Sequence, residues 1–173
     1  FLRRIALVND RLIIAVDGPA GAGKSTIAKK VAEILEIEYI DTGAMYRALT
    51  LKVIKSGIDS KDSKNILKLM ESTSIYFKDN QIYLDGTSVD KEIRENIINN
   101  NVSNVAKIGK VREEMVIMQQ ELSKTNNLIM DGRDIGTVVL PNANFKFFII
   151  ASIEERARRR YKELLEKGEK GIS

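Results

Sequence analysis

The sequence of 173 residues contains no cysteine and no histidine. Without cysteine, the chain has no disulfide framework, no thiolate zinc ligand and no thiol nucleophile. Without histidine, imidazole metal ligands, Ser-His-Asp triads and imidazole proton shuttles are excluded as well. Any chemistry must therefore use lysine, arginine, carboxylates, hydroxyls and backbone N–H groups. That inventory suits the handling of phosphate, where positioning and charge neutralisation do most of the catalytic work.

Long apolar runs are also missing. No stretch approaches the ~20 consecutive apolar residues of a membrane span. The apolar run near the start, Ile5 to Val8, is shorter than the ~7–15 residues of a signal-peptide core. We therefore expect a cytoplasmic protein without a membrane partner. The first residue is phenylalanine rather than methionine, so we expect the start to be trimmed.

The composition is that of one folded domain. Hydrophobic residues make up 43% and charged residues 30%, and 28 basic against 24 acidic residues give a net charge of +4. A chain of this length can bury a hydrophobic core without disulfides or structural metals to stabilise it. A nucleic-acid partner would rest only on this charge and on the arginines at 156–160, so we expect none. Single arginines deserve notice because guanidinium groups bind phosphate as forks; they are Arg47, Arg94, Arg112 and Arg133.

Hydrophobic periodicity predicts an alternation of strands and helices. Apolar runs of the buried parallel type predict strands at 12–17, 127–131 and 145–150, with a shorter strand at 38–41. Helical spacing predicts helices at 26–35, 43–56, 62–71, 90–98, 103–123 and 153–167. This order predicts an α/β fold with a parallel central sheet. The predicted buried faces of three helices are Ile27, Val31, Ile34 and Leu35, then Met45, Leu49, Val53 and Ile54, then Val111, Met115, Met118 and Leu122.

A short segment breaks this rhythm. Three short alternating runs, 74–78, 81–84 and 87–89, are separated by Asp79-Asn80 and Asp85-Gly86. Asp-Gly between strands is a strong hairpin signal. We therefore expect a small antiparallel β insertion within the α/β chain.

The most specific motif is Gly18-Pro-Ala-Gly21-Ala-Gly23-Lys24-Ser25, which fits G-x-x-x-x-G-K-[ST] in full. It lies between a predicted strand and a predicted helix, the context that a phosphate-binding loop requires. In such a loop the backbone N–H groups surround phosphate, the lysine reaches the β- and γ-phosphates and the serine hydroxyl binds Mg²⁺. An ordinary glycine-rich turn is the simpler alternative. A dinucleotide fold would need glycine at position 26, which is threonine, and a ribose-binding acid for which Asp41 is only a loose candidate.

Two further segments specify the kind of nucleotide-binding protein: Asp41-Thr-Gly-Ala-Met-Tyr-Arg47 and Asp131-Gly-Arg-Asp-Ile-Gly-Thr137. Together with the loop, they closely resemble the bacterial-type cytidylate kinases, a family of P-loop nucleoside monophosphate kinases. Further matches are EIR at Glu92–Arg94, VREEM at Val111–Met115 and EERARRR at Glu154–Arg160. The resemblance extends from about Leu12 to Gly168. It implies a pyrimidine-nucleotide kinase, a transferase that uses ATP.

The resemblance also implies a domain organisation. A single three-layer P-loop NTPase domain at 12–173 would have a core at 12–60 and 100–152, an NMP-binding insertion at about 61–99, and the start of a helical lid at about 153–173. The family pattern continues with a further strand, a helix, and arginine and aspartate residues. We therefore expect a missing C-terminal part, an unpaired sheet edge, and a monomer when the chain is intact.

The resemblance implies transfer of the ATP γ-phosphoryl group to CMP or dCMP with Mg²⁺. ATP would be held by Gly18, Pro19, Ala20, Gly21, Ala22, Gly23, Lys24, Ser25, Thr26 and Arg160. CMP would be held by Thr42, Arg47, Ser103, Arg112, Arg133 and Asp134. The catalytic residues would be Lys24, Arg133, Asp131 and Arg159, and the metal would be supported by Ser25 and, through water, Asp131. No general base is needed, because the attacking phosphate oxygen is already ionised at pH 7.

Several of these residues have a simpler interpretation. Arg47 could pair with an acid on its helix surface, Thr42 could cap the next helix, and Asp131 and Asp134 could cap turns. The arginines at 156–160 could form a solvated face with Glu154, Glu155 and Glu163, and Met45 and Tyr46 suit packing.

Other functions remain open beside the leading one. Another small P-loop kinase, for a different monophosphate or for shikimate, would use the same loop, although the β insertion disfavours shikimate. A non-catalytic nucleotide-gated switch is a third possibility. A guanine-reading Asn-Lys-x-Asp run is absent from the sequence.

Overall fold

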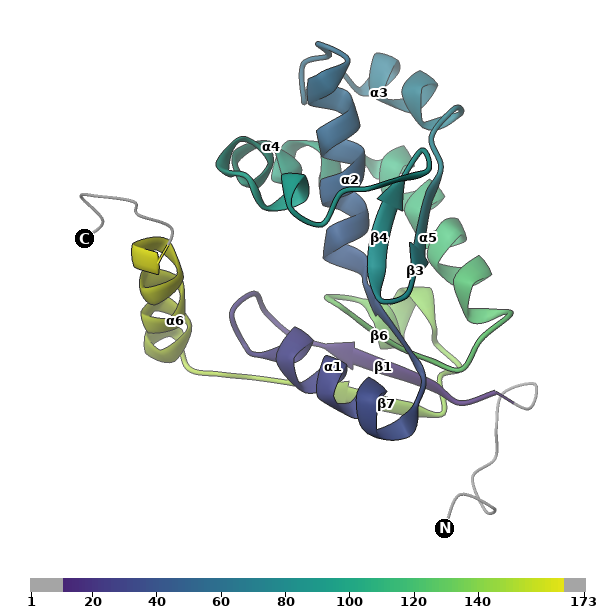
Figure 1. The fold of residues 1–173 in the computed structure, drawn as a ribbon, viewed down its shortest axis with the longest axis vertical. Helices are drawn as coiled ribbons and strands as arrows, with labels where there is room; N and C mark the ends of the chain where they lie inside the picture. The colour runs from purple at the N-terminus through teal and green to yellow at the C-terminus, as the bar shows by residue number, and fades with distance from the viewer. Residues whose placement is uncertain (1–10, 167–173) are drawn as a thin grey trace.

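The computed structural model describes residues 11–166, so the predicted lid residues 167–173 and the apolar run at 5–8 lie outside the described part. Figure 1 shows a sheet region at the bottom, from which helix α2 (Thr42–Lys55) leads into a second region of helices and a small sheet. Among the described residues, no helix is both long and apolar enough to span a membrane.

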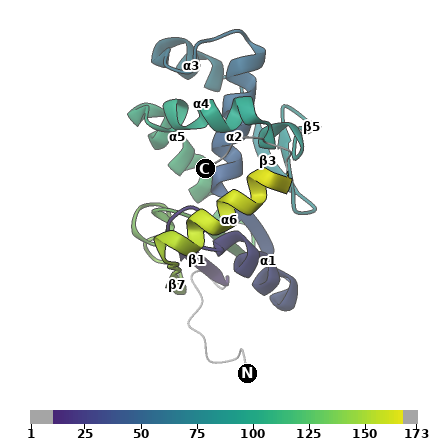
Figure 2. The same cartoon turned by 90° about the vertical axis from the view of Figure 1, so that its left-hand side faces the viewer.

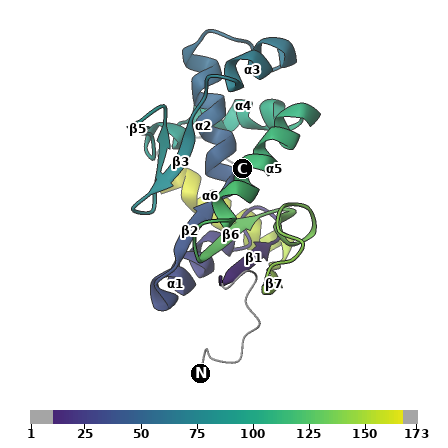
Figure 3. The same ribbon diagram turned by 90° about the vertical axis from the view of Figure 1, so that its right-hand side faces the viewer.

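The main sheet has four parallel strands in the order β2-β6-β1-β7, which Figure 3 shows from the side. The strands are β1 (Ile13–Asp17), β2 (Glu38–Asp41), β6 (Leu128–Gly132) and β7 (Phe145–Phe148). They lie within the four ranges that the sequence predicts, apart from Gly132, which extends β6 by one residue. In register, Asp17 is opposite Gly132 and Asp41 is opposite Asp131, so the carboxyl ends of three strands share one edge.

Helix α1 (Lys24–Leu35) packs against this sheet through small residues. Its buried residues are Ala28 and Ala32, whereas Ile27 is 49% exposed and Ile34 is 75% exposed. The predicted face is therefore wrong for Ile27 and Ile34, whereas its other two members, Val31 and Leu35, are half-buried and pack against the core. The alanines let the helix approach the strands closely, which leaves the larger isoleucines to the side and outside.

The second region contains the predicted antiparallel insertion. Its sheet is β3-β4-β5, and both hairpin turns, at Asp79-Asn80 and Asp85-Gly86, have positive φ at each residue, as tight hairpins require. The strands are β3 (Ile75–Lys78), β4 (Gln81–Leu84) and β5 (Thr87–Ser88), and the helices around them are α2 (Thr42–Lys55), α3 (Ser63–Met70), α4 (Asn96–Ala106) and α5 (Gly109–Ser123).

The helix boundaries between 90 and 123 differ from the prediction. The segment predicted as a helix at 90–98 holds only a 3-10 turn at Glu92–Arg94, and α4 begins at Asn96. The predicted helix at 103–123 is divided at Ile108, whose backbone is extended. Apolar residues at 105, 108 and 111 keep a helical spacing across this break, so periodicity alone does not reveal it.

Helix α2 supplies the centre of the larger core. Met45, Leu49 and Val53 are fully buried, as the sequence predicts, and Ile54 is half-buried. Replacing Leu49 with alanine leaves a cavity, so we expect the free energy of unfolding to fall by about 2–5 kcal/mol. Urea unfolding followed by circular dichroism measures this change, and a loss below about 1 kcal/mol would show that the site collapses around the alanine.

Strand β7 departs from the prediction of a buried strand. All four of its residues are exposed, including Phe147 at 54% and Phe148 at 69%. It pairs with β1 on one side, and the described residues leave much of both its faces exposed. An apolar run of this kind is typical of a strand buried on both faces, which is why the sequence suggested burial.

Candidate active site

The phosphate-binding loop lies between β1 and α1 and has the backbone that its glycines allow. Gly18 has a φ of 145°, and a Cβ there would lie 2.1 Å from the Ile149 carbonyl oxygen. Gly23, with a φ of 94°, directly precedes the first residue of α1. The Lys24 Nζ donates to the Pro19 carbonyl at 3.0 Å, which holds the loop curled. The loop therefore presents the N-terminus of a 12-residue helix as an anion site.

Asp131 accepts hydrogen bonds from three side chains near this loop. Its carboxylate is buried and accepts hydrogen bonds from the Ser25 Oγ at 2.7 Å and the Tyr39 hydroxyl at 3.1 Å. The Thr42 Oγ1 donates to the Asp131 backbone carbonyl at 2.8 Å. Burial, assisted by the charge of nearby Asp41, raises the pKa of Asp131. Sequence reasoning missed Tyr39, because nothing in a four-residue strand marks it as the partner of a residue 92 positions away.

Lys24 lies among several charges. Burial is the main cause that lowers its pKa. The neighbouring charges act in both directions: Arg133 lowers the pKa of Lys24, and three carboxylates raise it, those of Asp131, Asp41 and Asp17. The structure thus brings the loop lysine, the acids at the strand ends and Arg133 within electrostatic reach of one another.

The segment from Asp41 to Arg47 joins β2 to α2. Asp41 caps α2, because its Oδ1 accepts from the Ala44 N–H at 2.9 Å, so the alternative that Thr42 is the cap is wrong. The other carboxylate oxygen of Asp41 forms an ion pair with the Arg47 guanidinium at 3.2 Å. Gly43 leaves space beside them, since a Cβ there would lie 3.1 Å from the Asp41 Oδ1. The ion pair with Asp41, the last residue of β2, directs the Arg47 side chain back toward the strand ends.

The segment Gly132–Asp134, which we call the arch, begins at the same edge of the sheet, where Gly132 is opposite Asp17. Within it, Arg133 is exposed and makes no ion pair with the described residues. Asp134 pairs with Arg112 of α5 at 2.8 Å. Both charges lie near the half-buried Tyr46 of α2, whose pKa is raised mainly by burial, while Arg112 lowers it and Asp134 raises it. Ser103 is exposed on α4, and the structure gives it no polar contact with these residues.

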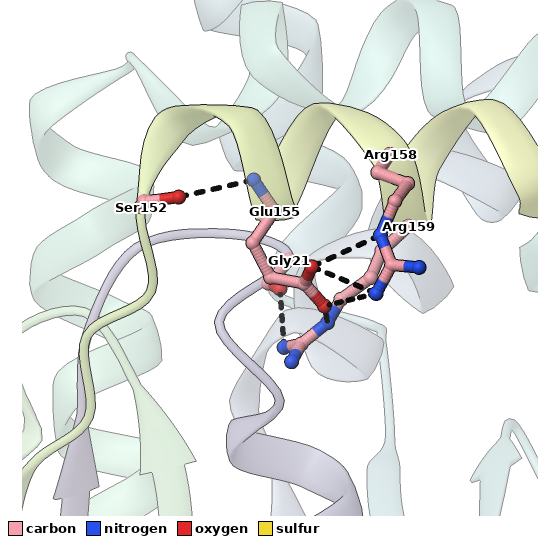
Figure 4. A network of polar contacts seen from close by, with 5 residues as sticks. All are labelled: Gly21, Ser152, Glu155, Arg158 and Arg159. Atoms are coloured by element: carbon pink, nitrogen blue, oxygen red, sulfur yellow. Dashed lines mark hydrogen bonds and ion pairs between the residues drawn. The ribbon is translucent and has the colours of Figure 1, made fainter.

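Helix α6 (Ile153–Glu166) brings the basic cluster to the phosphate-binding loop, on the side of the molecule that faces the viewer in Figure 2. The Arg159 guanidinium donates to the Gly21 carbonyl at 3.2 Å and to Glu155 at 2.7 Å, and Arg158 also binds Glu155 (Figure 4). A Cβ at Gly21 would lie 3.4 Å from the Cβ of Arg156, so the helix touches the loop.

Arg160 is placed differently. It pairs with Glu163 at 3.0 Å, and both side chains are half exposed. The cluster is therefore a solvated face held by glutamates, from which Arg159 contacts the loop.

The oxygens present fit a hard divalent cation. The described residues contain no group of three or more acidic side chains that could enclose a metal by themselves. Mg²⁺ in phosphate-transferring sites is held by one or two protein oxygens, with water and substrate phosphates completing its shell. The hydroxyl of Ser25 and the carboxylate of Asp131, 2.7 Å apart beside the loop, have this chemistry.

A parallel sheet whose first strand leads through this loop into a helix defines a P-loop nucleotide-binding domain. The sequence model of the family described as cytidylate kinase matches residues 14–173, so the chain belongs to the cytidylate kinase family.

Individual relatives agree with this assignment. The chain is 59% identical to a protein named cytidylate kinase from Clostridioides difficile (strain 630), over 91% of this chain and 73% of the relative. It is 57% identical to one from Alkaliphilus oremlandii (strain OhILAs), over 90% of this chain and 71% of the relative. A third, from Caldanaerobacter subterraneus subsp. tengcongensis, is 53% identical over 94% and 72% of the two chains. Each relative is therefore longer than the matched region.

Proposed function

We propose that this chain is a kinase that transfers the γ-phosphoryl group of ATP to CMP or dCMP, giving ADP and CDP or dCDP. The observation that carries the proposal is the shared edge of the sheet. There the phosphate-binding loop after β1 lies beside the arch after β6, and the charge of Arg133 acts on Lys24. This arrangement supports a donor site beside an acceptor site for two anionic nucleotides.

On the donor side, the backbone of Gly18–Thr26 would surround the ATP phosphates. Lys24 would neutralise charge on the β- and γ-phosphates. Arg159 already lies against Gly21, and we propose that it and Arg160 turn toward the transferring group. Ser25 and, through water, Asp131 would hold Mg²⁺, which would neutralise charge on the phosphates.

On the acceptor side, Arg47, Arg112 and Arg133 would bind the CMP phosphate as guanidinium forks. Asp134 now pairs with Arg112, and we propose that it turns to the cytosine amino group or the ribose. Ser103 would complete the contacts. The Thr42 hydroxyl donates its proton to the Asp131 carbonyl, so it can offer CMP only its lone pairs. Residues 61–99 would form the acceptor insertion of one kinase domain whose core is 12–60 and 100–152.

The reaction needs no proton acceptor. An ionised oxygen of the CMP phosphate attacks the γ-phosphorus in line, the new P–O bond forms, and the bond to the β–γ bridging oxygen breaks. ADP leaves with the electron pair of that bond. Catalysis therefore consists of positioning and charge stabilisation by Lys24, Mg²⁺ and the arginines. The absence of histidine and cysteine removes nothing that this mechanism requires.

A substrate panel tests the proposal. We expect ADP formation from ATP and Mg²⁺ to rise at least about 100-fold when CMP or dCMP is added, because the acceptor completes the site. A coupled assay for ADP measures the rate with CMP, dCMP, UMP, AMP and shikimate in parallel. If UMP, AMP or shikimate gives the highest rate, the chain is a different small kinase. If no acceptor changes the rate, it is a nucleotide-binding module and the proposal is wrong.

A further inference from the structure

The buried carboxylate of Asp17 has no role in the mechanism described so far. Asp17 is the last residue of β1, directly before Gly18 of the phosphate-binding loop, and is 7% exposed. Its Oδ1 accepts from the Ile135 N–H at 2.6 Å, and its Oδ2 accepts from the Gly136 N–H at 2.8 Å. Both oxygens of one buried carboxylate thus bind the chain just after the arch.

The first residue of the arch is also held next to Asp17. In the pairing of β1 with β6, Asp17 is the register partner of Gly132, the first residue of the arch. Asp17 therefore fixes the arch at both ends, through its strand position on one side and its carboxylate on the other. The two residues between these fixed points are Arg133 and Asp134, which we place in the acceptor site.

The turn that follows the arch needs this carboxylate. Residues Ile135–Val139 form a π-helical turn, in which the N–H groups of Val138 and Val139 bond to the Asp134 carbonyl. The first N–H groups of such a turn have no acceptor within it. Asp17 supplies that acceptor from 118 residues away in sequence. Bonds from N–H groups to an ionised carboxylate are stronger than those to a neutral oxygen.

Gly136 allows the carboxylate to approach this closely. A Cβ at Gly136 would lie 3.2 Å from the Asp17 Oδ2 and 3.1 Å from the Cδ of Lys146. A larger residue would therefore push the turn away from β1, and the arch with it.

We propose that Asp17 is a positioning residue that holds Arg133 and Asp134 in register with the phosphate-binding loop. This inference rests on the proposed function. Because Asp17 runs directly into Gly18, the donor loop and the acceptor arch are both fixed to a single residue. A displacement of about 1 Å between reacting groups can lower a rate by about 100-fold, so a direct tie between the two loops has a kinetic consequence.

The variant Asp17→Asn tests this role. It keeps the shape and one acceptor but presents an amide NH₂ to one of the two backbone N–H groups. We expect kcat/KM for CMP to fall at least about tenfold, because the arch loses its register. The dissociation constant for ADP, measured by calorimetry without CMP, should stay within about threefold of the wild-type value, because the loop backbone itself is unchanged.

Asn144→Ala is the matched control. The Asn144 Oδ1 accepts from the Ile13 N–H at 2.7 Å, so it ties a loop to the opposite end of the same strand. We expect this variant to lower the melting temperature without changing kcat/KM for CMP. If Asp17→Asn matches wild type in CMP kinetics, or weakens ADP binding as strongly as it affects CMP, the positioning role is wrong.

Amide hydrogen exchange separates this inference from the proposed function. We expect the Ile135 and Gly136 amides to exchange faster in Asp17→Asn than in wild type, while the amides of β6 stay protected. If wild type phosphorylates no monophosphate, the proposed function fails and the kinetic role of Asp17 fails with it. If wild type is active but exchange at these two amides is unchanged, only the positioning role fails.

Discussion

Replacing Lys24 with methionine is expected to lower kcat for CMP phosphorylation by about 1000-fold, a loss typical for a cation that stabilises a transferring phosphoryl group. Methionine keeps an unbranched apolar stem, one atom shorter than the lysine side chain, and removes the charge. The Lys24 ammonium is held at the loop by its bond to the Pro19 carbonyl, beside the Asp131 carboxylate. Initial rates at saturating ATP and CMP measure the effect, with circular dichroism to verify the fold.

Lys30→Met is the control for this variant. Lys30 lies on the same helix, is exposed, and points away from the core. We expect its activity to equal that of wild type within about twofold, as for a surface substitution away from the site. If Lys24→Met keeps more than about one tenth of the wild-type kcat, the ammonium is not part of the transition-state stabilisation, and the phosphate-binding loop would act through its backbone alone.

The parts of the fold that could be predicted are those set by local sequence. The loop from Gly18 to Ser25 combines glycine conformational freedom with a preceding apolar strand and a following helix, so its location follows from the sequence. The turns at Asp79-Asn80 and Asp85-Gly86 fix the small sheet in the same way. The parallel sheet follows from the alternation of strands and helices. Each of these signals lies within a few residues of the structure that it specifies.

The parts that were missed depend on contacts between distant segments. The face of α1 that packs on the sheet is set by how closely the helix approaches the strands, and the small Ala28 and Ala32 decide it. The exposure of β7 depends on which elements cover it, which its apolar sequence cannot state. Asp17 and Tyr39 matter because of partners at 135, 136 and 131, more than 90 residues away.

The location of the candidate site was easier to predict than the packing, because its motifs lie at the carboxyl ends of strands. Asp41 and Asp131 each come at or near the carboxyl end of a parallel strand, and these ends meet at one edge of the sheet. Once the parallel strands are predicted from the sequence, the motifs at their ends are therefore also predicted to lie close together. How the side chains pair within the site did not follow in the same way. The Arg47–Asp41 and Arg112–Asp134 pairs depend on the angle at which α2 and α5 leave that edge.

The second large effect is expected at Arg133, where lysine should lower kcat/KM for CMP by about 100- to 1000-fold. Lysine keeps the positive charge but replaces the planar fork of donors with a single ammonium group. Arg133 is exposed at the centre of the arch, makes no ion pair with the residues that the structure describes, and acts on the pKa of Lys24. These observations support the proposal that Arg133 binds phosphate between donor and acceptor.

Arg94→Lys provides the comparison, since Arg94 is another exposed single arginine, in the 3-10 turn at Glu92–Arg94. We expect this variant to retain the wild-type kcat/KM within about threefold, because exposed charges contribute little by themselves. Steady-state kinetics with varied CMP at saturating ATP, together with melting temperatures, measure both variants. A uniform loss in the two would show that the effect is not specific to Arg133, and an unchanged kcat/KM in Arg133→Lys would show that a positive charge there is sufficient. A loss confined to Arg133→Lys, with equal melting temperatures in the two variants, requires the guanidinium fork itself, since both variants keep the charge.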